Sequence, residues 1–171
     1  MNSAVPQFSP SPYIAGTIYD TAMMQASAYN LGAWPVNNQA YYIPVVLPTT
    51  ETILSVSIFC GATGSGTFDL GIFDSTCSTK LQGLGSTSLV AGINTWTLAS
   101  PMLAKVGERF HLGMSCSTTG ATVVRNQPTA LFCRRGGGET QQATAHPLPS
   151  SPTPVNQSSV HLPTFALAFR S

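Results

Sequence analysis

Charged side chains are scarce in this sequence. Lys and Arg number 7 and Asp and Glu number 6, so charged residues make up 8% of the 171-residue chain, against roughly 25% in typical soluble domains. The formal net charge of +1 provides no broad electrostatic footprint for a nucleic acid or an anionic membrane. We therefore expect no nucleic-acid partner. A surface of neutral hydroxyls and amides suits packing into an assembly or exposure on a particle, and a monomeric all-β protein with little surface charge is the alternative.

Long apolar runs and an export signal are also missing. No apolar stretch approaches the roughly 20 residues that span a bilayer. The first residues, MNSAVPQFSPSPY, contain neither a basic n-region nor an apolar h-region. We therefore expect a protein that is made in the cytoplasm, is not exported by a signal peptide and is not inserted into a membrane.

Cysteine is infrequent, and its spacing excludes a common metal motif. The four cysteines are Cys60, Cys77, Cys116 and Cys133. None of the gaps is the short C-x₂₋₄-C of a zinc site, so we expect no structural metal. The even count would suit two disulfides in an oxidising compartment. Since no export signal is present, a reducing cytosol is the better inference, and we expect four thiols, mostly buried as small apolar side chains.

Catalytic motifs are absent as well. Asp69 and Asp74 are the only acids close in sequence, and five positions apart on a strand they face opposite sides, which favours solvation or turn hydrogen bonding over joint acid–base work. The serines include no G-x-S-x-G nucleophile elbow. The scattered histidines are typical of surface or interface positions: His111, His146 and His161. Residues 61–66 are glycine-rich, but no Lys-Ser/Thr follows them as in a phosphate loop. We predict a non-enzymatic protein without a cofactor.

Strand-like alternation is the main feature that is present. Between residues 40 and 74, three runs are separated by turn-like breaks, which predicts a β-meander. Phe68, Leu70 and Ile72 fall at every second position, as in a strand with one buried face. Val56, Ile58 and Cys60 alternate in the same way with Ser55, Ser57 and Phe59. Further strands are predicted within the following runs: 80–90, 94–98, 107–116, 121–125, 129–133 and 160–169.

Three stretches depart from this alternation. Residues 1–16 are rich in Pro and Ser, and we expect them to be held against a neighbouring subunit or to fold back over their own domain. Residues 18–31 predict one short helix with Asp20 or Thr21 as its N-cap. Residues 134–157 are rich in Gly, Pro, Ser and Gln, and they predict a long loop that contacts a partner.

About nine short strands with Gly and Pro turns predict an all-β fold, an antiparallel β-sandwich of jelly-roll-like topology with an extended N-terminal arm. We assign residues 1–38 to the arm with its short helix. Residues 39–171 form the sandwich domain, which carries the long loop.

Several segments carry a family resemblance. They are AYYIPVVLP at residues 40–48, a run that ends in Cys60-Gly61, TFDLGIFDS at residues 67–75, and the terminal PTFALAFRS. Together they resemble a β-sandwich domain of tailed-bacteriophage virion proteins, over about residues 39–120 and the final strand. The resemblance implies a virion surface component made in the host bacterium, such as a head decoration protein, a fibre or a tail adsorption part, often trimeric.

Two functions remain open on this basis. The first is a structural protein on the virion, a capsid decoration or cement protein or a short head fibre, which assembles with itself and with other virion proteins through its N-terminal arm. The second is a tail fibre or receptor-binding module that recognises a host surface glycan. Candidate partner contacts are Pro6, Phe8, Pro10, Pro12, Tyr13, Arg134 and Arg135. A solvated loop is the plainer interpretation of the arginine pair.

Four aromatic residues are candidates for stacking on sugar rings. They are Trp34, Tyr41, Tyr42 and Trp96. Alternation places Trp96 with Asn94 and Leu98, so a core position is the favoured interpretation for this residue.

Overall fold

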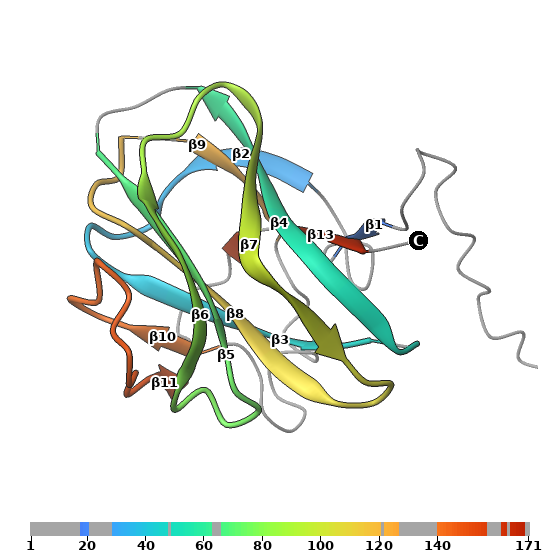
Figure 1. Ribbon diagram of the computed structural model, residues 1–171. Helices are drawn as coiled ribbons and strands as arrows, with labels where there is room; N and C mark the ends of the chain where they lie inside the picture. The colour runs from blue at the N-terminus through green and yellow to red at the C-terminus, as the bar shows by residue number, and fades with distance from the viewer. Residues whose placement is uncertain are drawn as a thin grey trace, which may run out of the picture.

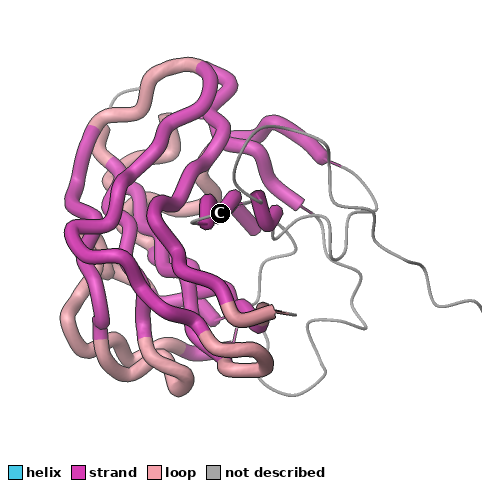
Figure 2. The backbone as a smooth tube through the Cα atoms, turned by 45° about the vertical axis from the view of Figure 1, so that its right-hand side comes forward, coloured by secondary structure: helices cyan, strands magenta, loops and turns pink. Residues whose placement is uncertain are grey.

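The structure, a computed structural model, describes residues 18–20, 29–47, 49–62, 66–120, 122–126, 140–156, 162–163 and 165–169. These residues form β-strands joined by turns and loops, and the described part contains no helix (Figure 2). The strands are β1 (Ile18–Asp20), β2 (Tyr29–Ala33), β3 (Ala40–Val46), β4 (Glu51–Ala62), β5 (Phe68–Phe73), β6 (Lys80–Thr87), β7 (Gly92–Ala104), β8 (Arg109–Cys116), β9 (Thr122–Asn126), β10 (Thr140–Gln142), β11 (Val155–Asn156), β12 (Leu162–Pro163) and β13 (Phe165–Phe169).

The strands form two antiparallel sheets, which confirms the predicted all-β architecture (Figure 1). Sheet A contains β1, β13, β4, β9 and β12 in that order, with β2 paired to β9 and β7 paired to β4. Sheet B has the order β11-β10-β3-β8-β5-β6. In both sheets, strands far apart in the sequence are hydrogen-bonded neighbours, as β3 and β8 are.

The C-terminal strands β12 and β13 lie between β9 and β4 in sheet A. One edge of β9 pairs with β2. The other edge pairs with β4 at Thr122 and Val123, and with β12 at Arg125 and Asn126. β4 pairs through one edge with β7 and through the other with β9 and then β13. β12 and β13 therefore lie where β4 and β9 diverge, and β1 pairs with the free edge of β13.

One core lies between the inner faces of the two sheets. Sheet A contributes Val56, Ile58 and Cys60, and sheet B contributes side chains such as Leu70 and Leu112, all of them buried. The alternation expected in β4 is confirmed, and the side chains expected to face inward from β5 and β8 are buried in this core; those of β8 are Phe110, Leu112, Met114 and Cys116. Burial of these apolar faces stabilises the packed sheets, at roughly 25 cal/mol per Å² removed from water.

The two sheets also approach each other along one edge, where β6 ends sheet B and β7 ends sheet A. β7 carries an irregularity there, because Ile53 pairs with Met102 while Ser55 pairs with Thr97. The displaced segment of β7 reaches sheet B, where Gln82 Nε2 donates a 2.8 Å hydrogen bond to the Ser100 carbonyl. Farther along this edge no hydrogen bond between β6 and β7 occurs among the described residues.

The structure corrects three expectations from the sequence. The predicted helix over 18–31 is wrong, because β1 and β2 occupy both ends of that range; residues 21–28 lie outside the described part. Residues 29–38 belong to the two-sheet body rather than to an arm, since β2 pairs with β9 and Trp34 is in the core. The predicted loop over 134–157 contains two strands, β10 and β11, that pair with each other and extend sheet B.

Candidate functional site

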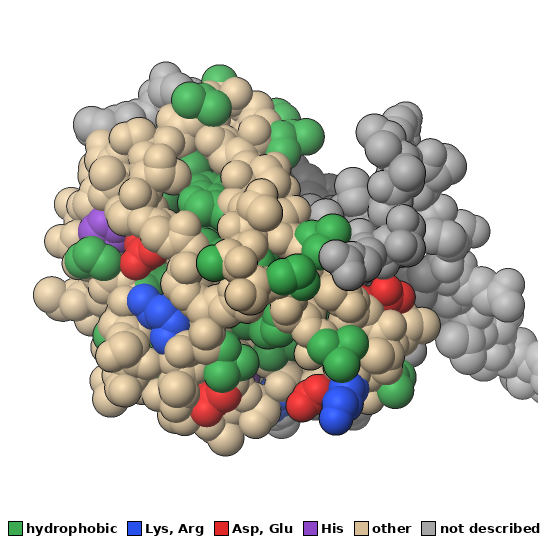
Figure 3. All heavy atoms as spheres, in the orientation of Figure 1, with side chains coloured by type: hydrophobic (Ala, Val, Ile, Leu, Met, Phe, Trp, Pro, Cys, Tyr) green, Lys and Arg blue, Asp and Glu red, His purple; other side chains and the backbone are tan. Residues whose placement is uncertain are grey.

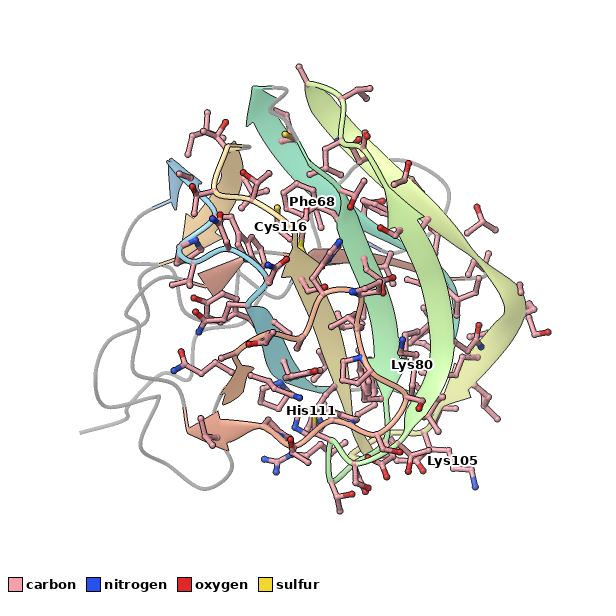
Figure 4. The ribbon with its side chains drawn as sticks, turned by 90° about the vertical axis from the view of Figure 1, so that its left-hand side faces the viewer. Phe68, Lys80, Lys105, His111 and Cys116 are labelled. Carbon is pink, nitrogen blue, oxygen red and sulfur yellow. The ribbon has the colours of Figure 1, made fainter. Side chains whose placement is uncertain are left out.

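A segment at the end of the predicted loop covers the outer face of sheet B. We call residues 143–154, between β10 and β11, the strap; it crosses in front of sheet B in Figure 4. Beneath it, all six residues of β5 are buried, although alternation alone would expose every second one. The strap and the outer face share a second apolar cluster: Ala40, Tyr42, Phe73, Cys77, Ala145 and Leu148.

Polar contacts tie the strap to the strands below it. The backbone N–H of Leu148 donates to Asp69 Oδ2 over 2.8 Å, and this carboxylate is 5% exposed. Lys80 Nζ donates to the Leu148 carbonyl. The backbone N–H of Lys80 donates to the Ser150 carbonyl over 2.8 Å. These hydrogen bonds satisfy backbone groups of an irregular segment that would otherwise be costly to bury.

His146 lies between two hydroxyl groups. Its Nδ1 is 3.0 Å from Ser115 Oγ and its Nε2 is 2.9 Å from Thr67 Oγ1. A serine beside a histidine suggests a nucleophile and its base, but Ser115 is completely buried and the second ring nitrogen contacts a threonine rather than a carboxylate. The arrangement fastens the strap and presents no reactive oxygen to a substrate.

His111 is buried, which corrects the expectation of a surface position. Its Nδ1 donates to the Asp74 carbonyl over 2.9 Å. Burial lowers the pKa of His111, and the nearby Arg109 lowers it further, against the opposing effect of the hydrogen bond to Asp74. His161 lies outside the described residues, and the described part contains no cluster of three potential metal ligands.

The two acids have separate structural roles. Asp69 holds the strap, whereas the Asp74 carboxylate accepts hydrogen bonds from the backbone N–H of Ser78 (2.7 Å) and Thr79 (3.3 Å) and from two hydroxyls of the same turn. Desolvation raises the pKa of Asp74, but these hydrogen bonds together outweigh it and lower the pKa to about 2. The turn hydrogen bonding expected for Asp74 is therefore confirmed.

The four candidate stacking aromatics are buried, so none presents a ring face to a sugar outside the protein. Trp34 packs edge-on against Tyr41 and Phe68, and its Nε1 donates to the Gln39 carbonyl over 3.0 Å. Tyr42 packs against Phe73 beneath the strap. The core position favoured for Trp96 is confirmed, since that residue is 8% exposed.

The other candidate residues cannot be placed. Pro6, Phe8, Pro10, Pro12, Tyr13, Arg134 and Arg135 all lie outside the described residues, as does Cys133. The remaining cysteines, Cys60, Cys77 and Cys116, carry buried thiols, as expected. Burial raises the pKa of Cys116 to about 11, an effect that outweighs the lowering by the hydrogen bond that the sulfur accepts from the Thr118 backbone N–H.

The outer face of sheet A combines exposed apolar groups with neutral hydroxyls. Phe59 and Ile93 are directly opposite each other on β4 and β7, with 44% and 72% of their surfaces exposed. Leu31, 56% exposed, lies against Gly61, where an added Cβ would be 2.6 Å from Leu31 Cδ2. Farther along the same two strands, the hydroxyls of Ser57 and Thr95 are 2.8 Å apart. No side chain is charged in residues 55–59 or 93–97.

A hollow of about 480 Å³ opens at the edge where β6 and β7 separate. Figure 3 faces this edge and shows hydrophobic side chains at the floor of a depression. The hollow is lined by Leu84, Gly85, Ser86, Thr87, Ser88, Val90, Ile93, Asn94, Thr95 and Trp96. Sequence reasoning placed these residues in strands and missed the hollow; a run of small hydroxyl residues shortly before a tryptophan was the available signal.

Comparison with known proteins gives no further assignment. No family model matches the chain, and no curated protein matches it. The described residues include no helix long and apolar enough to cross a membrane.

Proposed function

We propose that this protein is a non-enzymatic structural protein on the surface of a tailed-phage virion, a capsid decoration or cement protein or a short head fibre. The supporting observation is the outer face of sheet A, where Phe59, Ile93 and Leu31 are exposed and the adjoining side chains are uncharged. Exposed apolar side chains that lie together on a surface are typical of protein-binding sites. Such a face is better suited to contact with another protein than to chemistry.

Its partners in this proposal are further copies of the same chain, in a homotrimer, and the major capsid protein. The N-terminal residues form an arm that holds the protein on the particle. We also assign a jelly-roll-like topology, which is supported by antiparallel pairing between strands distant in sequence, β3 with β8 and β13 with β4. The protein is made in the host bacterial cytoplasm before it joins the virion.

Deletion of residues 1–16 tests the proposed attachment. These residues precede β1, so the truncated protein should fold and give the same circular dichroism spectrum as the full chain. We expect it to be lost from purified particles. Full occupancy on virions by the truncated protein would refute the arm as the anchor. Immunogold labelling of intact particles then distinguishes a location on the head from one on the tail. Label confined to the tail would contradict a head decoration protein.

A further inference from the structure

We propose that the hollow between β6 and β7 is a binding site for a neutral carbohydrate. Its volume of about 480 Å³ falls in the range of small-molecule sites. None of its ten lining residues carries a charge. It lies at the open edge of the two sheets, with Trp96 of the core among its lining residues.

The lining contains two kinds of group that a sugar ring requires, apolar surface and neutral hydrogen-bonding groups. Leu84, Val90 and Ile93 offer apolar surface for the C–H faces of a pyranose, and Val90 and Ile93 are 61% and 72% exposed. Serine and threonine hydroxyls offer neutral hydrogen-bonding groups for the ring hydroxyls. A purely apolar ligand would leave these hydroxyls desolvated without partners, at a cost. A charged sugar would find no counter-ion in the lining.

One wall of the hollow is fixed by Asn94. Its side-chain Nδ2 donates to the carbonyls of Val90 (2.8 Å) and Gly92 (3.1 Å), and its Oδ1 accepts from the Val90 backbone N–H (2.9 Å). The buried Leu89 anchors the same turn in the core. The backbone of this turn is therefore fixed before a ligand arrives, which lowers the entropic cost of binding.

The opposite wall supplies the groups that would contact the ligand. Ser88 is exposed, and within the described part of the chain its hydroxyl has no hydrogen-bond partner. Asn94 uses its amide to fix the turn, and Thr95 shares its hydroxyl with Ser57. Recognition of sugar hydroxyls is thus assigned to Ser88. The hollow shares Ile93 with the exposed face of sheet A, but it does not require the proposed role in the virion, and it would supply the glycan contact of a receptor-binding module.

Saturation-transfer NMR with the purified full chain tests this site. Maltotriose, lactose, cellotriose and N,N′-diacetylchitobiose are titrated separately, and at least one should bind saturably with a Kd of roughly 1 mM. Ser88→Arg fills the hollow and should weaken that binding by at least about tenfold. Ser100→Arg is the matched control, because Ser100 is an exposed serine on β7 that does not line the hollow, and its binding should equal that of the unmodified protein.

Several outcomes would overturn the assignment. They are the absence of saturable binding with all four sugars, equal binding by Ser88→Arg, and tighter binding of sialyllactose than of lactose. Incorporation of Ser88→Arg into particles is measured in parallel and should be normal. Sugar binding and incorporation into particles are therefore separate readouts. The first tests the hollow as a carbohydrate site, and the second tests the structural role.

Discussion

At the scale of single residues, Gly113 shows how closely the outer face of sheet B is packed. A Cβ at this position would lie 2.4 Å from Phe73 Cε2 and 3.0 Å from Tyr42 Cδ1. Gly113→Ala should therefore force both rings to shift and lower the free energy of unfolding by about 1–3 kcal/mol, measured by urea denaturation. Gly83→Ala is the control, since its nearest atom is 3.6 Å away in the Lys80 side chain; there we expect a change within about 0.5 kcal/mol.

Asp74 predicts a dependence of stability on acid pH. Its folded pKa of about 2 lies below the ordinary value of 3.8, so ionisation of this carboxylate favours the folded state above pH 3.8, and the contribution disappears as the pH falls through 2. Asp74→Asn retains an acceptor but does not titrate. The stability difference between the original protein and this variant should be small, because solvent screens the exposed group, and it should shrink between about pH 4 and pH 2. A difference that stays constant over this range would contradict the assignment.

At the scale of elements, the strap packs on the outer face of sheet B in an apolar cluster that is separate from the main core. Leu148 is buried in the second apolar cluster together with Cys77, whereas Cys60 and Cys116 belong to the main core. Leu148→Ala removes the main apolar contact of the strap, at a cost of about 2–5 kcal/mol if the cavity remains. We expect Cys77 to react with N-ethylmaleimide faster in this variant, as followed by peptide mass spectrometry.

The other two core thiols serve as internal references in the same experiment. Cys60 and Cys116 should stay protected in Leu148→Ala, because the strap does not cover them. Val155→Ala is the matched variant on β11, where the side chain is 61% exposed, and it should leave the labelling of Cys77 unchanged. Equal acceleration at all three cysteines would indicate global unfolding rather than opening of the strap.

The sequence predicted those strands whose alternation is set by one shared core. β4, β5 and β8 follow this rule, because their inward side chains meet the same apolar interior. β10 and β11 have no such signal: Thr140–Gln142 and Val155–Asn156 are short, largely polar segments, and their pairing with β3 and with each other makes them strands. For the same reason, the sequence pattern did not predict that the outer face of sheet B is buried.

The helix predicted over 18–31 and the stacking aromatics failed for a related reason. Local propensity favoured a helix, but pairing of β1 with β13 and of β2 with β9 decides the backbone there. Trp34 and Tyr42 belong to segments whose burial depends on elements distant in sequence, so composition could not distinguish a core ring from an exposed one. The hollow at β6 and β7 likewise arises from where the two sheets separate, which no local pattern records.

At the scale of the whole molecule, the two outer faces differ in kind. The face of sheet B is covered by the molecule's own strap, while sheet A presents the exposed pair Phe59 and Ile93 beside neutral hydroxyls. With a net charge of only +1, long-range repulsion between copies is weak. Self-association should therefore take place through sheet A.

Lysine substitution on sheet A tests this expectation. Phe59→Lys places a charge in the apolar patch without disturbing the core, because the native side chain is 44% exposed. If the protein is a trimer, light scattering coupled to size exclusion should give a mass near three times 17.9 kDa for the original chain and near 17.9 kDa for the variant. Val106→Lys, at an exposed turn position outside the patch, should keep the trimeric mass. A monomeric mass for the unmodified protein at micromolar concentration would refute trimerisation, and a trimeric Phe59→Lys variant would move the interface away from this face.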